Sequence, residues 1–326
     1  MGSIIPPIEI YLDMLLAELI AQSATKILSN LAGLSLRPDP NDRSKSEVVW
    51  FVTNWTKDLQ DAIDGFETKP TRKKRGRSPT TVIQTGPLRP VPHPGRRKRI
   101  GLGATVAIEG RATEGTVGGL LAADPQGARY LLTCRHVLDG RIGDNVVMLR
   151  PDGSEPLVAK LTRISDWTLG LKPSQPNSTD FAIAELNQKV SGKPAGPIPI
   201  APQPAGNIVR LPIVPWRNLK LKGVQVRPAP ISFVQFPYGQ FTMSGMWLLW
   251  STDPQVHLAE HGDSGSLFVF RTGEKLIPAA IAVGVSTEYT EVTNGTLAKT
   301  KGPPAVLACP VINIFKELKI PGLKFC

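Results

Sequence analysis

The first 66 residues carry apolar side chains at steps of three and four, the spacing of one face of an α-helix. This spacing predicts a helix over residues 8–34 that ends near Gly33. A second helix is predicted from Ser44, because Ser44 and Glu47 have the spacing of a capping box. The positions that define the two stripes are Leu12, Leu16, Leu19, Ala24, Ile27 and Leu31, then Val48, Val52, Trp55, Leu59 and Ile63. We therefore predict a small N-terminal helical module over 1–66, whose stripes fit a helical hairpin, docking on another domain, or oligomerisation.

The pattern changes at about Ile100. From there short apolar runs such as "ATVAIEG", "YLLTCRHV", "DFAIAEL" and "GSLFVF" alternate with turn residues and prolines. Many short strands at regular intervals are typical of an antiparallel barrel or sandwich. A last helical pattern, "VINIFKELK" at 311–319, closes the chain. Residues 100–326 are therefore predicted to form one mainly β domain with a C-terminal helix.

Between these two parts, residues 67–99 contain six prolines and the clusters "RKKRGR" and "RRKR". A stretch this charged and proline-rich buries too little apolar surface to fold, so it is predicted to be an extended linker. Eleven of the 38 Lys and Arg residues lie between Lys69 and Arg99, and no Asp or Glu does. The remaining 27 basic residues equal the 27 acidic ones, so the net charge of +11 belongs to this segment.

The basic segment 69–99 has four interpretations that the sequence leaves open. It could be a solvated tether, a nuclear-import signal read by an import receptor, a polyanion-binding strap, or a processing site. No aromatic residues interleave its charges, so stacking on nucleic-acid bases is not supported. The start of the chain lacks the basic region and cleavage site of a secretory signal, and no apolar run is long enough to span a membrane. With three cysteines only, these features predict an intracellular protein, cytoplasmic or nuclear, and not a classically secreted one.

The candidate chemistry centres on Ser264, in the stretch "EHGDSGSLFVF". A nucleophilic serine needs a base and an orienting carboxylate from elsewhere in the chain. His136 ends one apolar run, and Asp180 opens another. Asp166, in "ISDWTL", competes with Asp180 for the orienting position. The histidines and cysteines are scattered without ligand spacing, so no metal and no cofactor are predicted.

Three short motifs, "TCRHV", "DFAIAEL" and "GDSGS", occur in the order His, Asp, Ser. In this order and with these flanks, residues 100–326 resemble the chymotrypsin/trypsin-fold serine peptidases, of the intracellular, bacterial or virus-encoded kind. The resemblance implies two antiparallel β-barrels with an active site in the cleft between them. It also implies a serine endopeptidase that cleaves a polypeptide substrate through an acyl-enzyme.

The resemblance assigns a task to each site residue. Ser264 would attack the scissile carbonyl, His136 would carry the proton, and Asp180 would hold the imidazole in the correct tautomer. The loop Gly262, Asp263 and Ser264 would form the oxyanion hole, with the N–H groups of Gly262 and Ser264 as donors. The expected substrate-binding residues are Leu258 at the base of the specificity pocket, His261 over the site, and Ser286, Thr287 and Glu288 in the pocket wall. Ser286 is also expected to support the Asp180 carboxylate.

The stretch "RRKRIGLG" raises a question of activation. Secreted relatives are cut after a basic residue, and the new Ile N-terminus pairs with the Asp before the serine. In this chain the cut would follow Arg99, and the ammonium of Ile100 would reach Asp263. Other relatives order the same loop without cleavage, so both routes stay open. The alternative to an enzyme is an interaction or assembly protein that uses its barrel domain for binding and its basic segment for nucleic acid or nuclear targeting.

Overall fold

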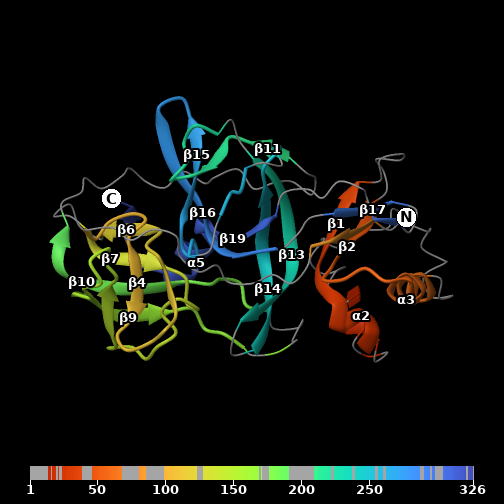
Figure 1. Cartoon of the computed structure of the whole chain (residues 1–326), viewed down its shortest axis with the longest axis horizontal. Helices are drawn as coiled ribbons and strands as arrows, with labels where there is room; N and C mark the ends of the chain where they lie inside the picture. Colours follow the sequence, from red (N-terminus) through yellow and green to blue (C-terminus); the bar gives the residue numbers. More distant parts are fainter. Residues whose placement is uncertain are drawn as a thin grey trace, which may run out of the picture.

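Two β-sheets and a C-terminal helix make up most of the protein (Figure 1). The computed structural model describes residues 14–15, 17–19, 21, 24–38, 46–67, 81–85, 99–122, 128–168, 170, 176–190, 209–221, 224–236, 239–253, 256–259, 262–286, 290–293, 296–297, 304–320 and 322–325. The predicted fold class, mainly β with a C-terminal helix, is confirmed: α5 (Val311–Leu318) occupies the place of the helix predicted at 311–319. No helix in the described ranges is long and apolar enough to cross a membrane.

The first sheet is antiparallel and contains eight strands in the order β20-β6-β7-β10-β9-β8-β4-β5. They are β4 (Thr105–Ile108), β5 (Glu114–Thr116), β6 (Gly119–Ala122), β7 (Ala128–Thr133), β8 (Asn145–Met148), β9 (Leu157–Ile164), β10 (Ala182–Val190) and β20 (Lys324–Phe325). Only Val117 and Gly118 separate β5 from β6, although these strands lie near opposite ends of the order. The sheet therefore curves until its two ends come together, and it forms the first barrel.

The second sheet continues from the second barrel into the N-terminal part of the chain. Its barrel strands are β11 (Val209–Leu211), β12 (Ile213–Pro215), β13 (Val224–Phe236), β14 (Gly239–Trp250), β15 (Leu267–Thr272), β16 (Lys275–Val285) and β19 (Val306–Pro310). β12 pairs with β15 at one end of the row, whereas β11 pairs with β13 at the other. Because Pro212 alone separates β11 from β12, the row closes on itself as a second barrel.

The N-terminal part extends this sheet beyond β13. It contributes α2 (Thr25–Asn30), β1 (Leu31–Pro38), β2 (Ser46–Val52), α3 (Lys57–Glu67) and β3 (Thr81–Gln84), and β17 (Thr290–Thr293) and β18 (Thr296–Leu297) follow β3 in the sheet. In Figure 1 β1, β2 and β17 lie together at one end of the molecule, and in the sheet β3 lies between β2 and β17. The pairing of β2 with β3 is parallel, whereas the other ladders are antiparallel.

The prediction of a purely helical N-terminal module is therefore wrong for two segments. The first predicted helix ends at Asn30, and residues 31–34 belong to β1. The helix predicted from Ser44 is a strand over 46–52, and only its second half is helical, as α3. The reason is the uninterrupted run Val48-Val49-Trp50-Phe51-Val52, which fits a helical stripe and a buried strand equally well.

Both faces of β2 are buried, which explains this run of apolar residues. Val48, Trp50 and Val52 pack with α2, α3 and Phe233 in one cluster, whereas Val49 and Phe51 belong to the main core. Burial on two faces favours a central strand over a surface helix. Of the second predicted stripe, Val48, Val52, Leu59 and Ile63 are buried and Trp55 is half-buried, whereas the buried residues 49–51 lay outside the stripe.

The prediction of an extended linker over 67–99 is also wrong at one point. Thr81, Val82, Ile83 and Gln84 form β3, which is paired on both edges. Two adjacent β-branched apolar residues supply the buried surface that the surrounding basic and proline residues lack. Residues 68–80 and 86–98, with most of the basic side chains, lie outside the described residues, as do residues 8–13 of the first predicted helix.

Truncation of Trp50 tests whether the N-terminal strands belong to the folded core. Trp50 is fully buried and stacks edge-on against Phe66 of α3. We expect Trp50→Ala to lower the free energy of unfolding by about 3–5 kcal/mol, as for other large-to-small core changes, in urea denaturation followed by circular dichroism. Asp61→Ala, on the exposed face of α3, is the matched control and should change little. A cost for Trp50→Ala as small as that of the control would contradict the packing of β2.

Candidate active site

The register of one ladder brings His136 and Asp180 together. Thr133, the last residue of β7, pairs with Ala182, the first residue of β10. The turn that follows β7 therefore lies beside the residues that precede β10. Across this junction His136 Nδ1 lies 2.6 Å from Asp180 Oδ2. Of the two aspartates considered for this position, Asp180 makes the contact, whereas Asp166 is exposed and lines an open cavity elsewhere.

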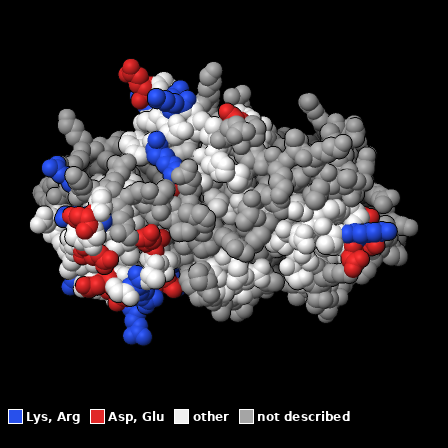
Figure 2. Space-filling view, viewed as in Figure 1, with Lys and Arg blue, Asp and Glu red and all other residues white. Residues whose placement is uncertain are grey.

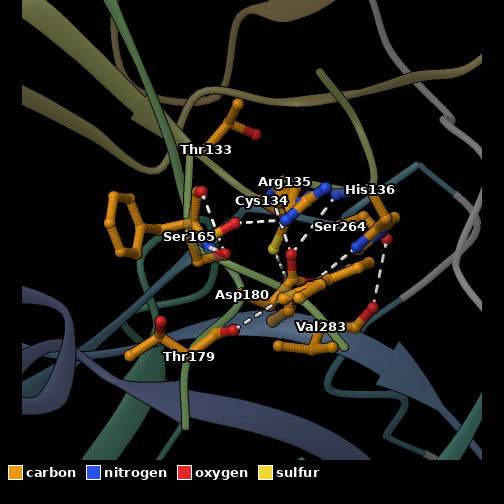
Figure 3. A network of polar contacts seen from close by, with 12 residues as sticks. Thr133, Cys134, Arg135, His136, Ser165, Thr179, Asp180, Ser264 and Val283 are labelled. Atoms are coloured by element: carbon orange, nitrogen blue, oxygen red, sulfur yellow. Dashed lines mark hydrogen bonds and ion pairs between the residues drawn. The ribbon is translucent and has the colours of Figure 1, made fainter. Parts of the chain in front are cut away.

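The Asp180 carboxylate is fully buried, and backbone groups hold its other oxygen. Oδ1 accepts hydrogen bonds from the N–H groups of Arg135 at 2.8 Å and His136 at 3.3 Å. The next residue, Phe181, is tied to Ser165 by a backbone bond of 2.9 Å and by a bond of 3.2 Å to the Ser165 hydroxyl. Figure 3 shows Cys134, Arg135 and His136 gathered beside Asp180. A buried charge persists only with such partners, so this carboxylate and the His136 ring fix each other's position.

Cys134 occupies the remaining side of this carboxylate. Its sulfur lies 3.1 Å from the carbonyl oxygen of Ala282, and burial raises the pKa of the thiol well above its usual value, with the Asp180 charge raising it further. The thiol is therefore protonated at neutral pH. One donor atom each of Cys134, His136 and Asp180 lie within 4.8 Å of one another, which would suit a metal ion. The Asp180 oxygens, however, already accept three hydrogen bonds from the Arg135 and His136 N–H groups and the His136 ring.

Ser264 lies in a tight turn that both barrels hold. The N–H of Thr116, in β5 of the first barrel, donates to the Ser264 carbonyl at 2.7 Å, and the Thr116 hydroxyl donates to the Gly262 carbonyl at 2.6 Å. From the second barrel, the Ala282 carbonyl accepts the N–H of Gly265 at 2.7 Å. Gly265 has φ +90°, and a Cβ there would lie 2.2 Å from the Thr133 hydroxyl. Only glycine therefore fits beside Ser264.

Ser264 and His136 lie at the same junction between the barrels but do not share a hydrogen bond here. A Cβ added at Gly115 would touch both the Val137 side chain and the Ser264 carbonyl, which places the two turns within a few ångströms. The Ser264 hydroxyl lies 3.5 Å from the Val283 carbonyl, as drawn in Figure 3. Within the described part of the chain, His136 Nε2 is buried without a hydrogen-bond partner. Such catalytic bonds are often long in free enzymes and shorten when substrate binds.

The predicted oxyanion loop contains a buried ion pair. Asp263 is almost fully buried, and its Oδ2 lies 2.5 Å from Nη1 of Arg217, in the turn after β12. The same loop has Gly262 at φ +92°, a conformation that glycine adopts without strain. Arg99 is exposed, and Ile100 is half-buried against the main core. In the uncut chain, therefore, the guanidinium of Arg217 already pairs with the Asp263 carboxylate.

The structure describes two of the five predicted substrate-binding residues, Leu258 and Ser286. Leu258 is buried in the core of the second barrel. Ser286 does not support Asp180, which corrects that expectation: its N–H donates to the Ala305 carbonyl at 2.8 Å, and its hydroxyl accepts the Ala305 N–H at 2.8 Å. The residue of β16 that faces Ser264 is Val283, three positions earlier in the chain than the predicted Ser286. His261, Thr287 and Glu288 lie outside the described residues.

Sequence reasoning missed an aromatic cluster beside His136. The ring of Phe236, at the end of β13, lies 4.7 Å from the His136 ring, centroid to centroid. Trp167 stacks on Phe236 at 5.1 Å and contacts Phe241 at 4.7 Å. His136 and Ser264 are only 2% and 1% exposed. The cluster had no sequence signal, because its members come from separate strands and loops.

On the face drawn in Figure 2, the charged side chains of the described residues do not gather into a basic surface. Instead, Lys, Arg, Asp and Glu side chains are intermixed there over the first barrel. This mixture agrees with the cancelled charge outside 69–99. A nucleic-acid-binding face would gather one sign of charge.

Comparison with known proteins gives a likeness of fold only. No family model matches the chain, and no curated protein does. Among solved structures, the active form of the Rv3671c protease from M. tuberculosis is 14% identical, with TM-score 0.33 over 66% of this chain and 78% of that one. The MamO protease domain from Magnetospirillum magneticum is 13% identical, with TM-score 0.31 over 67% and 96%. Human heparin binding protein is 15% identical, with TM-score 0.33 over 66% and 87%. Because the sequence identities and TM-scores are this low, the assignment of function depends on the site residues themselves.

Removal of Arg217 tests the buried ion pair. Arg217→Ala leaves the Asp263 carboxylate without this partner, and we expect the free energy of unfolding to fall by about 1–3 kcal/mol in chemical denaturation. The loss should be smaller than for a fully buried pair, because the Arg217 side chain is 32% exposed. Adding Asp263→Asn to Arg217→Ala should recover part of it, whereas Lys220→Ala, an exposed cation of the same turn, should cost little. If Arg217→Ala and Lys220→Ala lowered the free energy of unfolding by the same amount, the stabilising role of the Arg217–Asp263 pair would be contradicted.

Proposed function

We propose that the protein is a serine endopeptidase in which Ser264, His136 and Asp180 act as one unit. The observation that carries the proposal is the 2.6 Å contact between His136 Nδ1 and the buried Asp180 carboxylate, at the junction where the turn of Ser264 meets both barrels. A carboxylate accepts only, so this contact makes Nδ1 the protonated nitrogen. Nε2 is then left with the lone pair that a general base needs.

The proposed reaction has two steps, acylation of Ser264 and hydrolysis of the acyl-enzyme. Ser264 Oγ attacks the scissile carbonyl carbon while His136 Nε2 takes the hydroxyl proton, and His136 then gives that proton to the leaving amine as the C–N bond breaks. Water attacks the resulting ester in the second step, with the same nitrogen taking the proton and returning it to Ser264. Asp180 stabilises the imidazolium that forms in each step and remains ionised throughout.

The loop around Gly262 stabilises the negative charge that develops on the carbonyl oxygen. The N–H groups of Gly262 and Ser264 are the proposed donors, and one such donor is worth about 3 kcal/mol. The Arg217–Asp263 pair supports this loop in the uncut chain. We therefore propose that activity does not require cleavage after Arg99, and that the free amine of Ile100 has no part in the site.

Access for substrate requires a movement beside His136. Both His136 and Ser264 are almost fully buried, and Phe236 stacks on the imidazole. Displacement of the Phe236 ring opens one side of the imidazole without disturbing the Asp180 contact, which lies on Nδ1. A small electrophile is therefore the most suitable first probe of the serine.

Labelling by a fluorophosphonate tests the nucleophile. We expect the full-length protein to gain one adduct by intact mass, because a serine beside a neutral imidazole is activated. The adduct should be absent from Ser264→Ala and present in Ser266→Ala, the nearest serine in the same loop. Arg99→Ala, which blocks the predicted cut, should label as wild type does. An unlabelled wild-type protein would contradict the proposed function, and labelling only after a cut at Arg99 would contradict activity of the uncut chain.

Substitution of Asp180 tests the tautomer argument. Asp180→Asn keeps the size of the side chain but presents an amide, so we expect kcat on a peptide substrate to fall about 10³–10⁴-fold. Asp166→Asn changes the exposed aspartate that was the alternative to Asp180 in the sequence, and it should leave kcat unchanged. Comparable losses in the two variants, or none in Asp180→Asn, would remove Asp180 from the mechanism.

A further inference from the structure

Thr116, the last residue of β5, contacts the loop around Ser264 through both its backbone and its side chain. Its N–H donates to the Ser264 carbonyl at 2.7 Å, and its hydroxyl donates to the Gly262 carbonyl at 2.6 Å. Thr116, Gly262 and Ser264 are all buried. A carbonyl oxygen only accepts, so the hydroxyl hydrogen of Thr116 points at Gly262. One residue of the first barrel therefore holds this loop at two carbonyls.

A second hydroxyl holds Thr116 itself. The Thr133 hydroxyl donates to the Thr116 carbonyl at 2.7 Å, and Thr133 has no exposed surface. Thr133 is the last residue of β7 and stands three residues before His136. Two successive hydroxyl–carbonyl bonds thus connect the segment of the proposed base to the loop of the proposed oxyanion donors.

The Gly262 N–H, one of the proposed donors, depends on such an external restraint. Gly262 has φ +92° and no Cβ, so the peptide groups on either side of its Cα rotate at little cost. Its N–H makes no hydrogen bond to the described residues, and its direction follows from how the next peptide group is held. The Thr116 hydroxyl bonds the carbonyl of that group, and Arg217 pairs with the Asp263 side chain beyond it.

We propose that Thr116 is a positioning residue of the oxyanion hole: its hydroxyl holds the Gly262–Asp263 peptide group so that the Gly262 N–H points at the oxygen that becomes negatively charged. The proposal rests on the proposed peptidase function. The hydrogen bonds of Thr116 go to carbonyls of the loop and not to Ser264 Oγ or the His136 ring. None of the three motifs contains Thr116, so β5 adds a residue to the site that sequence reasoning missed.

Phosphonylation of Ser264 reports on the donors without a known peptide substrate. Ser264 Oγ forms a bond to phosphorus, the serine proton passes to His136, and fluoride leaves. The phosphonyl oxygen takes the place of the carbonyl oxygen and develops negative charge in the same way. A donor that points elsewhere stabilises this transition state less, and the reaction slows.

The test compares Thr116→Val, which keeps the shape of the side chain and removes the hydroxyl, with Thr116→Ser, which keeps the hydroxyl. The matched control is Thr162→Val, because the Thr162 hydroxyl in β9 also donates to a backbone carbonyl, that of Ile183, at 2.9 Å. Two quantities are measured in the full-length protein. They are the second-order rate constant of labelling by a small fluorophosphonate and the phosphorus NMR shift of the Ser264 adduct, folded and in urea.

We expect Thr116→Val to slow labelling about tenfold or more, since loss of a whole oxyanion donor costs about 10²–10³-fold. The phosphorus shift of its folded adduct should move from the wild-type value towards the value in urea. Thr116→Ser and Thr162→Val should label within about twofold of wild type and keep the wild-type shift. A wild-type rate or shift in Thr116→Val would overturn the proposal, and so would an equal loss in Thr116→Ser or Thr162→Val.

The proton between His136 Nδ1 and Asp180 separates an effect on the donors from damage to the base. A proton in so short a charge-assisted bond resonates far downfield in proton NMR. We expect this signal at the same position in wild type and in Thr116→Val. A loss or large shift of the signal in Thr116→Val would place the damage at His136 and overturn the role assigned to the Gly262 N–H.

Thr116→Ala keeps the proposal testable if Thr116→Val does not fold. It also lacks the hydroxyl, and it sets no methyl group against the Gly262 carbonyl. We expect it to slow labelling in the same way, and a wild-type rate in the folded variant would overturn the proposal. A wild-type protein that the fluorophosphonate does not label would instead overturn the proposed function, and the role of Thr116 with it.

Discussion

The buried carboxylate of Asp180 is the constraint on which the site depends. A charged group with no exposed surface is tolerated only where several donors reach it, and here the donors are the N–H groups of Arg135 and His136 and the His136 ring. These donors are in reach because β7 and β10 pair in a register that sets Thr133 opposite Ala182. A slip of one residue in that ladder would turn each side chain to the other face. The orientation of His136 is thus a consequence of strand pairing in the first barrel.

The turn of Ser264 adds the second barrel to this arrangement. Thr116 holds the turn from one barrel and Ala282 from the other, and Gly265 lets the two approach to within contact of Thr133. Arg217 neutralises the charge that Asp263 buries in the same loop. The proposed nucleophile, base and oxyanion donors therefore depend on the fit between the two barrels, which share one hydrophobic core. The N-terminal strands continue the sheet of the second barrel from β13 through β1, β2 and β3 to β17.

The sequence predicted those features whose physical signal is local. The triad candidates followed from three short motifs at strand ends, and short apolar runs predicted a mainly β domain with a C-terminal helix. The run Val48–Val52 was misread as helix, because a strand buried on both faces loses the alternation that marks strands. β3 was missed since its four residues stand among basic residues and prolines, and only its partners β2 and β17 make it a strand. Likewise nothing in the sequence pairs Arg217 with Asp263, places Phe236 on His136, or puts Val283 opposite Ser264: these contacts come from tertiary packing.

A crystal structure of the protein after reaction with a peptidyl phosphonate would test most directly whether Ser264, His136 and Asp180 act as one unit. We predict a covalent bond from phosphorus to Ser264 Oγ, with His136 Nε2 within hydrogen-bond reach of the adduct and Nδ1 still bound to Asp180. One phosphonyl oxygen should accept hydrogen bonds from the N–H groups of Gly262 and Ser264. An adduct on another residue, or a phosphonylated Ser264 with the His136 ring turned away from it, would contradict the triad.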